Sequence, residues 1–169
     1  MKLTYLLGFI GILVVLLVLM AWGAPGNQSA KVPVPSTSGT VSSTALKAAE
    51  NFFDFGTISM ANGLVDHKFK ITNSTGADIE LKTVTTSCMC TVAYIEGGAV
   101  TKGPFGMPGM GSVPPANEVI KAGESRDIKV VYDPNAHGPS GVGSIDRLVY
   151  LTDASGGTIQ LEIKAVVTP

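Results

Sequence analysis

An alternation of apolar and polar side chains begins near Asn51 and constrains the fold more than any other feature of this sequence. The clearest example runs from Leu64 to Thr72, where every second residue is apolar except for one histidine. Successive side chains of a β-strand point to opposite faces, so this pattern predicts a strand with one face in a hydrophobic core. The inward face holds Val65, His67, Phe69 and Ile71, and the outward face holds Asp66, Lys68, Lys70 and Thr72.

Six further segments with strand character lie between Asn51 and the C-terminus, separated by turns. They lie at 53–55, 79–83, 92–95, 126–132, 145–152 and 158–167, with glycine-containing turns at 73–76, 122–124 and 153–157. About seven short strands at this spacing are typical of two antiparallel sheets packed face to face. The sequence therefore predicts an all-β sandwich of about seven strands. Val84 breaks the alternation of its strand, which indicates a β-bulge.

The N-terminus carries an almost unbroken apolar run from Leu3 to Ala24. As a helix this run would extend roughly 33 Å, which is enough to span the hydrocarbon core of a bilayer. We therefore predict a single transmembrane helix, with the rest of the chain outside the cytoplasm because Lys2 precedes the run. A cleaved signal peptide is the alternative, since Ala21 and Gly23 have the spacing of a cleavage site, and it would give a secreted protein.

Residues 25–50 separate the apolar run from the alternating segments and are rich in Pro, Ser, Gly and Thr. Such a segment buries too little apolar surface to offset the entropy of folding, which predicts a flexible spacer. Its last residues, Ala45–Glu50, have the composition of one short helical turn. The predicted organisation is thus an anchor over 1–24, a spacer over 25–50 and a β-sandwich over 51–169.

The charge and motif content argues against several classes of function. With a formal net charge of −1 and 15% charged residues, the chain lacks the basic face that nucleic-acid binding requires. The sequence has no H-E-x-x-H, G-x-S-x-G or phosphate-binding glycine motif, so we expect neither enzymatic activity nor a small-molecule substrate. The expected role is a binding or structural module that recognises another protein through a sheet edge or loops.

Four stretches of the chain together resemble one bacterial protein family. They are Phe53–Ile58, Phe69–Asn73, Thr86–Thr91 and Ala122–Glu124. A Phe-Asp-Phe-Gly opening followed by a cysteine pair is similar to the family called domain of unknown function 1573. That family usually has Cys-Gly-Cys, whereas Met89 stands in the middle here. The resemblance runs from Asn51 to about Val167 and implies no activity.

The same resemblance implies an immunoglobulin-like fold, related to major-sperm-protein and hydin-type domains, and a place outside the cytoplasm. Together with the apolar run, it predicts a single-pass protein of the bacterial cytoplasmic membrane. The membrane contact is Leu3–Ala24, and the C-terminal domain lies in the periplasm or at the cell surface. The expected partner is another protein of the cell envelope.

Cys88 and Cys90 are the only two cysteines and lie between predicted strands. In an extended strand their Cα atoms would be roughly 6.6 Å apart, so a bridge between them requires the chain to bend. Four interpretations remain open: a labile redox disulfide, a site for a soft metal ion such as Cu(I), a link between two chains, and two buried reduced thiols without a function. A redox-active or copper-binding envelope protein is therefore the alternative to a binding module.

Three methionines are candidates for additional ligands at such a copper site. Met89, Met107 and Met110 could supply thioether sulfurs, which soft ions prefer, beside the two cysteines. Met107 and Met110 belong to an insertion rich in Gly and Pro over residues 97–115. Apolar packing of this insertion onto the sandwich is the alternative role for its methionines.

The two histidines are weaker candidates. His67 lies on the inward face of its strand, which favours a partly buried side chain with a hydrogen-bond partner. His137 lies in a loop between Pro134 and Pro139, which favours a solvated residue. Either could assist Cys88 as a base only if folding brings the two residues together.

Overall fold

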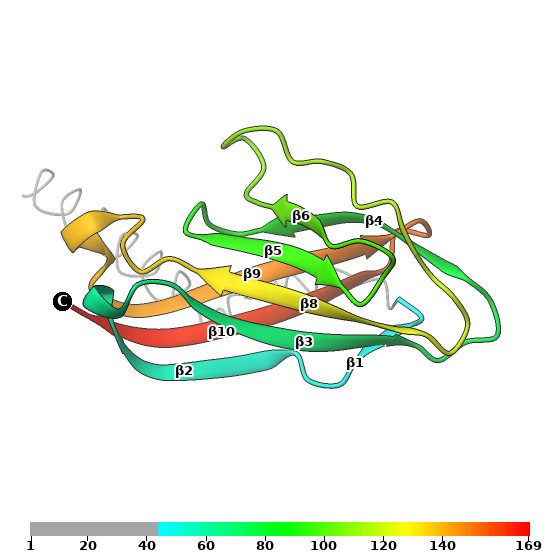
Figure 1. Ribbon diagram of the computed structural model, residues 1–169, viewed down its shortest axis with the longest axis horizontal. Helices are drawn as coiled ribbons and strands as arrows, with labels where there is room; N and C mark the ends of the chain where they lie inside the picture. The colour runs from blue at the N-terminus through cyan, green and yellow to red at the C-terminus, as the bar shows by residue number, and fades with distance from the viewer. Residues whose placement is uncertain (1–43) are drawn as a thin grey trace, which may run out of the picture. The chain divides into compact units, whose positions relative to one another are not determined.

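The computed structural model of the protein describes residues 44–169, which form two β-sheets without an α-helix (Figure 1). The predicted anchor at Leu3–Ala24 and residues 25–43 of the predicted spacer lie outside the described residues. Within residues 44–169, none of the helical segments has the length and apolar character that a membrane crossing needs. The prediction of an all-β fold is confirmed for this part of the chain.

The first sheet has five strands, and every neighbouring pair in it is antiparallel. Its central strand β8 pairs on one side with β3 and on the other with β5. The alternating segments predicted at 64–72 and 126–132, which form β3 and β8, are therefore neighbours in the sheet. In spatial order the strands are β1 (Leu46–Ala48), β3 (Val65–Asn73), β8 (Ser125–Tyr132), β5 (Thr91–Glu96) and β6 (Lys102–Phe105).

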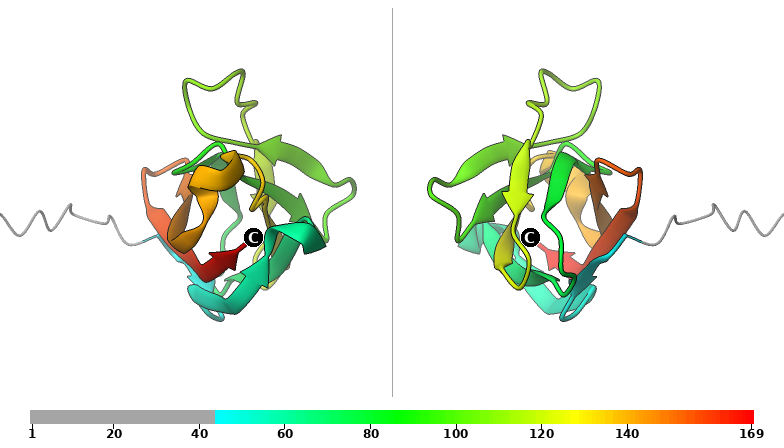
Figure 2. Two further views of the ribbon diagram at one scale, coloured as in Figure 1. Left: turned by 90° about the vertical axis from the view of Figure 1, so that its left-hand side faces the viewer. Right: turned by 90° about the vertical axis from the view of Figure 1, so that its right-hand side faces the viewer.

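The second sheet also has five strands, and only β2 and β10 run parallel in it. In spatial order its strands are β2 (Phe52–Ser59), β10 (Thr158–Thr168), β9 (Gly143–Asp153), β4 (Ile79–Thr86) and β7 (Glu118–Ile120). Viewed along the long axis, the two sheets lie face to face (Figure 2). The antiparallel sandwich expected from the sequence is therefore present in residues 44–169, with one parallel pair.

The sheets contain ten strands rather than about seven, because three short edge strands were not predicted. β1 and β7 have three residues each and β6 has four, which is too short to show a period of two. The helical turn expected over Ala45–Glu50 is wrong, since this segment holds β1. Backbone pairing explains the difference: β1 lies antiparallel to β3, and the N–H of Ala49 donates to the carbonyl of Lys70 at 2.9 Å.

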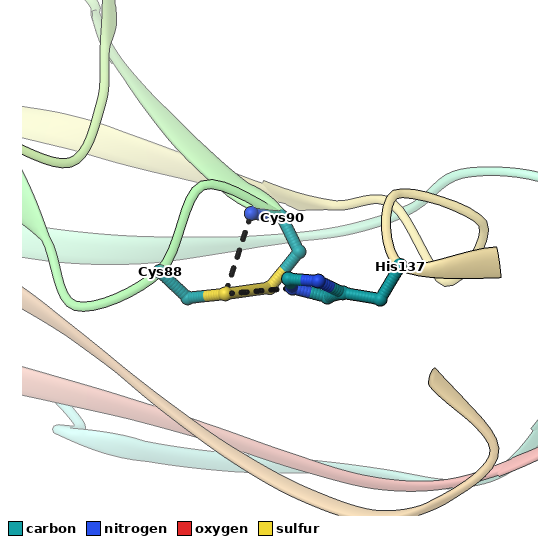
Figure 3. Close-up of side chains that lie close together, drawn as sticks. All are labelled: Cys88, Cys90 and His137. Carbon is teal, nitrogen blue, oxygen red and sulfur yellow. Dashed lines mark hydrogen bonds between the residues drawn. A yellow bond between two sulfur atoms is a disulfide. The ribbon is translucent and has the colours of Figure 1, made fainter. Parts of the chain in front are cut away.

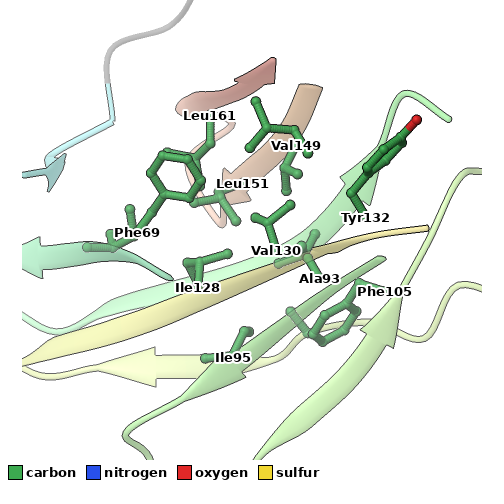
Figure 4. Packing of buried hydrophobic residues seen from close by; sticks show 14 of the residues in the cluster. Phe69, Ala93, Ile95, Phe105, Ile128, Val130, Tyr132, Val149, Leu151 and Leu161 are labelled. Carbon is green, nitrogen blue, oxygen red and sulfur yellow. The ribbon is translucent and has the colours of Figure 1, made fainter. Parts of the chain in front are cut away.

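Apolar side chains from both sheets meet in one core, part of which is shown in Figure 4. Phe69 and Ile71 of β3 are fully buried, whereas Lys68 and Lys70 are exposed, which confirms the predicted alternation. Burial of apolar surface of this kind is the main force that holds two sheets together. The other fully buried large side chains are Tyr132, Phe105, Leu81, Ile95, Ile120, Ile128, Leu151, Leu161, Ile163 and Val84.

The predicted bulge in β4 is confirmed. The pairing of β4 with β9 changes register between Leu81 and Thr83, directly before Val84. Leu81 and Val84 are both fully buried although an odd number of positions separates them. An extra residue in one strand shifts the alternation by one position, which is how both side chains reach the core.

One carboxylate, Glu118 of β7, is nearly buried and paired with two cations. Its oxygens lie 2.8 Å from Lys102 Nζ and 2.7 Å from Arg126 Nε, and its side chain is only 10% exposed. Burial alone would raise the pKa of Glu118, but the hydrogen bonds and charges of Lys102 and Arg126 lower the pKa below the ordinary value for a carboxyl. Glu118 thereby ties β7 at the edge of one sheet to Lys102 and Arg126 of the other.

We expect this cluster to make the fold acid-sensitive. A carboxyl whose pKa is lowered by folding stabilises the fold above its unfolded-state pKa, and this contribution is lost as the pH falls through the lower folded-state pKa. The free energy of unfolding should therefore decline below about pH 4, and Glu118→Gln should cost about 1–3 kcal/mol near neutral pH and flatten the decline. Urea unfolding near neutral pH and at about pH 3 measures both effects.

The matched control for this prediction is Glu80→Gln. Glu80 pairs with Lys82 at 2.9 Å, but its side chain is 35% exposed and that of Lys82 is 47% exposed. Exposed pairs contribute little, so this variant should unfold within about 0.5 kcal/mol of the unaltered protein at either pH. Equal losses for the two variants would contradict a specific role for Glu118.

Candidate functional site

Cys88 and Cys90 form a disulfide in a bend between β4 and β5, shown in Figure 3. Their Cα atoms are 5.3 Å apart, closer than an extended strand allows, so the bend that a bridge was expected to require is present. No free cysteine remains in residues 44–169. Because β4 and β5 belong to different sheets, the bridged turn is also one of the connections that carry the chain from one sheet to the other.

Buried threonines and backbone hydrogen bonds fix the conformation of this turn. The hydroxyl of Thr86 donates to the carbonyls of Cys88 and Thr91 at 3.0 Å each, and the N–H of Thr91 donates to Cys88 at 3.2 Å. The N–H of Ser87 donates to the carbonyl of Leu148 on β9 at 2.9 Å, and the hydroxyl of Ser87 accepts from the N–H of Leu148. The positions of the two sulfurs are thus set by the folded backbone around them.

The sulfur of Cys88 is half-buried and faces a histidine. Nε2 of His137 lies 3.3 Å from Cys88 Sγ, and the N–H of Cys90 donates to the same sulfur at 3.4 Å (Figure 3). His137 is exposed and comes from the loop between β8 and β9, directly before a 3-10 turn at Gly138–Gly141. That loop starts beside the cysteines, because the N–H of Asp133 donates to the carbonyl of Cys90 at 2.8 Å.

The sulfur of Cys90 is buried and has different partners. Cys90 is only 2% exposed, and Arg147 of β9 donates from Nε to its sulfur at 3.2 Å. The hydroxyl of Thr91 lies 3.7 Å from the same sulfur. The guanidinium group is held in place by a second hydrogen bond, from Nη1 of Arg147 to the carbonyl of Asp146 at 2.8 Å. Each sulfur of the bridge therefore has its own hydrogen-bond donors.

Cys88, His137 and Arg147 line a groove that is open to solvent. The groove has a volume of about 630 Å³ and is bordered on β9 and β10 by polar and charged side chains. The remaining lining residues are Ser87, Asp146, Leu148, Gln160 and Glu162. Since Cys90 is buried and does not line the groove, a molecule in the groove reaches Cys88 first.

Cys88, Cys90 and His137 form a cluster with the composition of a metal site. The sulfurs of Cys88 and Cys90 and a ring nitrogen of His137 all lie within 4.8 Å of one another. In residues 44–169 this is the one group of three or more His, Cys, Asp or Glu side chains with such spacing. Cysteine sulfur and imidazole nitrogen together suit soft and borderline transition-metal ions.

The methionines proposed as ligands have mixed environments. Met89 sits between the cysteines and is about half exposed, and Met110 is 58% exposed. Met107 is half-buried, and its carbonyl accepts from the N–H of Met110 at 3.3 Å. The alternative role, in which apolar side chains of the insertion pack onto the sandwich, fits Phe105, which is buried at the end of β6. It does not fit Met110, which is exposed.

The two histidines have different environments. As the sequence predicted, His67 is half-buried and has a hydrogen-bond partner, Glu50 at 2.7 Å. Its ring also stacks on that of Phe53, with 3.6 Å between the ring centroids, which was not predicted. His137 is exposed as expected, but folding brings it to Cys88 from 49 positions away. Arg147, which is 57 positions from Cys90, was not predicted to belong to the site, and no local pattern in the sequence marks it.

Comparison with solved structures supports the fold alone. A protein of unknown function from Porphyromonas gingivalis W83 is 17% identical, with a TM-score of 0.51 over 72% of this chain and 46% of that one. A family 123 glycoside hydrolase from Clostridium perfringens is 8% identical, with a TM-score of 0.50 over 70% of this chain and 23% of that one. The chain thus spans less than half of either structure. No curated protein matches it.

The comparison with protein families agrees with the resemblance seen in the sequence. The matched segment begins at β1 and ends at the close of β6, so it includes the bridged turn but not His137 or Arg147. It is shorter than the expected range of Asn51 to about Val167 and starts five positions earlier, at residue 46. Over residues 46–106, the chain matches the family described as protein of unknown function, DUF1573.

Proposed function

We propose that this protein exchanges its Cys88–Cys90 disulfide with the thiols of partner proteins in the bacterial cell envelope. The observation that carries the proposal is that each sulfur has a different polar side chain beside it. Nε2 of His137 lies 3.3 Å from Cys88 Sγ, and Nε of Arg147 lies 3.2 Å from Cys90 Sγ. Thiol–disulfide exchange releases one sulfur at a time as a thiolate, and a donor at that sulfur stabilises the thiolate.

The first step of the exchange follows from the exposure of the two sulfurs. A thiolate of the partner attacks Cys88 Sγ, which borders the open groove, and forms a mixed disulfide with it. The bond between Cys88 and Cys90 breaks, and its electron pair leaves on Cys90 as a thiolate. The guanidinium of Arg147 stabilises this thiolate, because it already donates a hydrogen bond to Cys90 Sγ.

The second step releases the partner. A second thiolate of the partner attacks its own sulfur in the mixed disulfide, so that the partner gains a disulfide and Cys88 leaves as a thiolate. The imidazole of His137 and the N–H of Cys90 lie beside Cys88 to stabilise it. Two electrons have then passed from the partner's dithiol to the cysteine pair, and the reverse sequence reduces a partner disulfide.

The proposed setting is an immunoglobulin-like module held at the outer face of the cytoplasmic membrane. The apolar run Leu3–Ala24 would serve as the anchor and part of 25–50 as the spacer, which gives the groove reach toward other envelope proteins. The Cys88–Cys90 bridge supports this setting, because disulfides persist in oxidising compartments such as the periplasm and are rare in the cytosol.

The proposal predicts that one cysteine variant traps partners and the other does not. In Cys90→Ser the accessible Cys88 lacks its resolving thiol, so mixed disulfides with envelope proteins should accumulate and resist separation without reductant. In Cys88→Ser the remaining thiol is buried and should trap nothing. Pull-down of the full chain from detergent-solubilised membranes, followed by electrophoresis with and without reductant, measures the outcome.

The matched control is His67→Ala, which removes a histidine outside the groove. It should leave trapping by the Cys90→Ser background unchanged. Equal trapping by the two cysteine variants, or none by either, would contradict exchange at Cys88. Recovery of the trapped complexes in the soluble cytoplasmic fraction would contradict the envelope setting.

A binding module without redox chemistry is the second candidate, favoured by the edge of the second sheet. There β7 presents Val119, which is about half exposed, and pairs with a neighbour on one side only. A strand edge can accept a strand of a partner by backbone hydrogen bonds, and here Arg126 Nη2 would first have to release the carbonyl of Val119, to which it donates at 3.2 Å. Capture of the same partner by the double variant Cys88→Ser/Cys90→Ser, without a covalent link, would favour this candidate.

A further inference from the structure

We propose that the reduced form of this site binds one Cu(I) ion through Cys88 Sγ, Cys90 Sγ and Nε2 of His137. The inference rests on the proposed function, because the two sulfurs become available to an ion only after exchange has opened the disulfide. It adds a third ligand from a loop far along the chain, and it makes metal binding depend on the redox state of the cysteine pair.

The positions of the three ligand atoms are close to those that an ion requires. Bonds of about 2.2 Å to sulfur and nitrogen place three ligands in a plane roughly 3.8 Å from one another. Cys88 Sγ and Nε2 of His137 are already 3.3 Å apart, and the whole set lies within 4.8 Å. Once the S–S bond is broken, the main change needed is a small separation of the two sulfurs.

The number and softness of the ligands select the ion. Two thiolates and one imidazole favour Cu(I) over the hard cations Mg²⁺ and Ca²⁺, which prefer oxygen. Structural Zn²⁺ sites take four ligands, and no fourth His, Cys, Asp or Glu belongs to this cluster in residues 44–169. The groove carboxylates Asp146 and Glu162 are paired with Lys164 instead, at 3.4 and 2.8 Å.

Arg147 provides the charge that such a centre lacks. Two thiolates and one Cu(I) ion carry a net charge of −1, which is costly beside a buried sulfur unless a cation lies near it. Arg147 Nε is 3.2 Å from Cys90 Sγ, which is the buried one of the two sulfurs. A thiolate bound to a metal still accepts hydrogen bonds, and donors of this kind are typical neighbours of metal ligands.

The chemistry of loading and release balances with a dithiol as reductant and a disulfide as oxidant. A dithiol reduces the bridge by two electrons and itself becomes a disulfide, leaving two thiols on the protein. Cu(I) then replaces the two thiol protons, which pass to water. An incoming disulfide that reoxidises the pair takes up two protons, becomes two thiols, and releases Cu(I) because the ligands are again bonded to each other.

The experiment titrates the full chain in mild detergent with Cu(I), in competition with a coloured Cu(I) chelator and without oxygen. Protein reduced by a dithiol and freed of it should retain one Cu(I), and the oxidised protein should retain none. His137→Ala should weaken binding by at least about 10-fold, because even the loss of a group that only supports a metal ligand costs about 10- to 100-fold. Met110→Ala, a change at an exposed sulfur outside the cluster, should bind as the unaltered protein does. X-ray absorption should show two sulfurs and one nitrogen around copper.

A parallel thiol count separates failure of this inference from failure of the proposed function. If a dithiol exposes no thiols, exchange itself is wrong. If two thiols appear but copper is not retained, or His137→Ala binds Cu(I) as tightly as the unaltered protein, exchange stands and the copper site is overturned. Retention of Zn(II) in preference to Cu(I) would overturn the choice of ion.

Discussion

Replacing Arg147 by Gln is expected to slow the attack of a thiolate on Cys88 by about 10- to 100-fold. The variant removes the cation that donates to Cys90 Sγ at 3.2 Å, so the thiolate leaving on Cys90 loses its main stabilisation. The loss should be smaller than that of a donor in an enclosed oxyanion site, because the groove beside Arg147 is open to water. Stopped-flow reduction of the full chain by a small dithiol measures the rate.

Two further variants make this test specific to the guanidinium group. Arg147→Lys keeps a positive charge and should recover part of the rate. Lys164→Gln removes a charge that pairs with Asp146 and Glu162 at the groove but is not hydrogen-bonded to either sulfur, so its rate should stay close to that of the unaltered protein. An unchanged rate in Arg147→Gln, or an equal loss in Lys164→Gln, would refute the assigned role.

Phe69→Ala is expected to cost about 3–5 kcal/mol of the free energy of unfolding. Phe69 is 0% exposed at the middle of β3 and packs in the core formed by both sheets (Figure 4). Its removal loses the burial of an aromatic ring and leaves a cavity that neighbouring strands, fixed by their hydrogen bonds, fill only in part. Urea unfolding followed by far-UV circular dichroism measures the difference in the free energy of unfolding.

Phe52→Ala is the matched control, since it makes the same change on β2 at a ring that is 45% exposed. It should cost less than about 1.5 kcal/mol, because part of the ring already contacts water. A loss for Phe69→Ala no larger than that of Phe52→Ala would show that the centre of the core has been placed wrongly.

The fold could be predicted where a strand has apolar residues at every second position, because those residues face the core. β3 and β10 have that pattern because each has one face in the core, as Phe69 and Leu161 show. The edge strands could not be predicted in this way. β1 contributes one buried side chain, Leu46, and is a strand because its backbone pairs with β3. Backbone hydrogen bonds of that kind leave little trace in a sequence.

The site could be predicted only as far as its local part. Cys88 and Cys90 stand out because they are two positions apart, and the need for a bend follows from strand geometry alone. His137 and Arg147 come from a loop and a strand about fifty positions further along the chain, and their contacts with the sulfurs exist only when the two sheets have closed. The spacing of residues in the sequence does not predict such contacts, so His137 and Arg147 could not be assigned to the site.

The bridged turn is the segment where the chain leaves β4 in one layer and enters β5 in the other. Ser87 fastens it to β9, and the carbonyl of Cys90 fastens the loop that bears His137. Opening or closing one covalent bond here therefore alters the stiffness of this connection between the two sheets as well as the chemistry of two atoms. A protein bound to either sheet would therefore contact a surface whose flexibility depends on the redox state of Cys88 and Cys90.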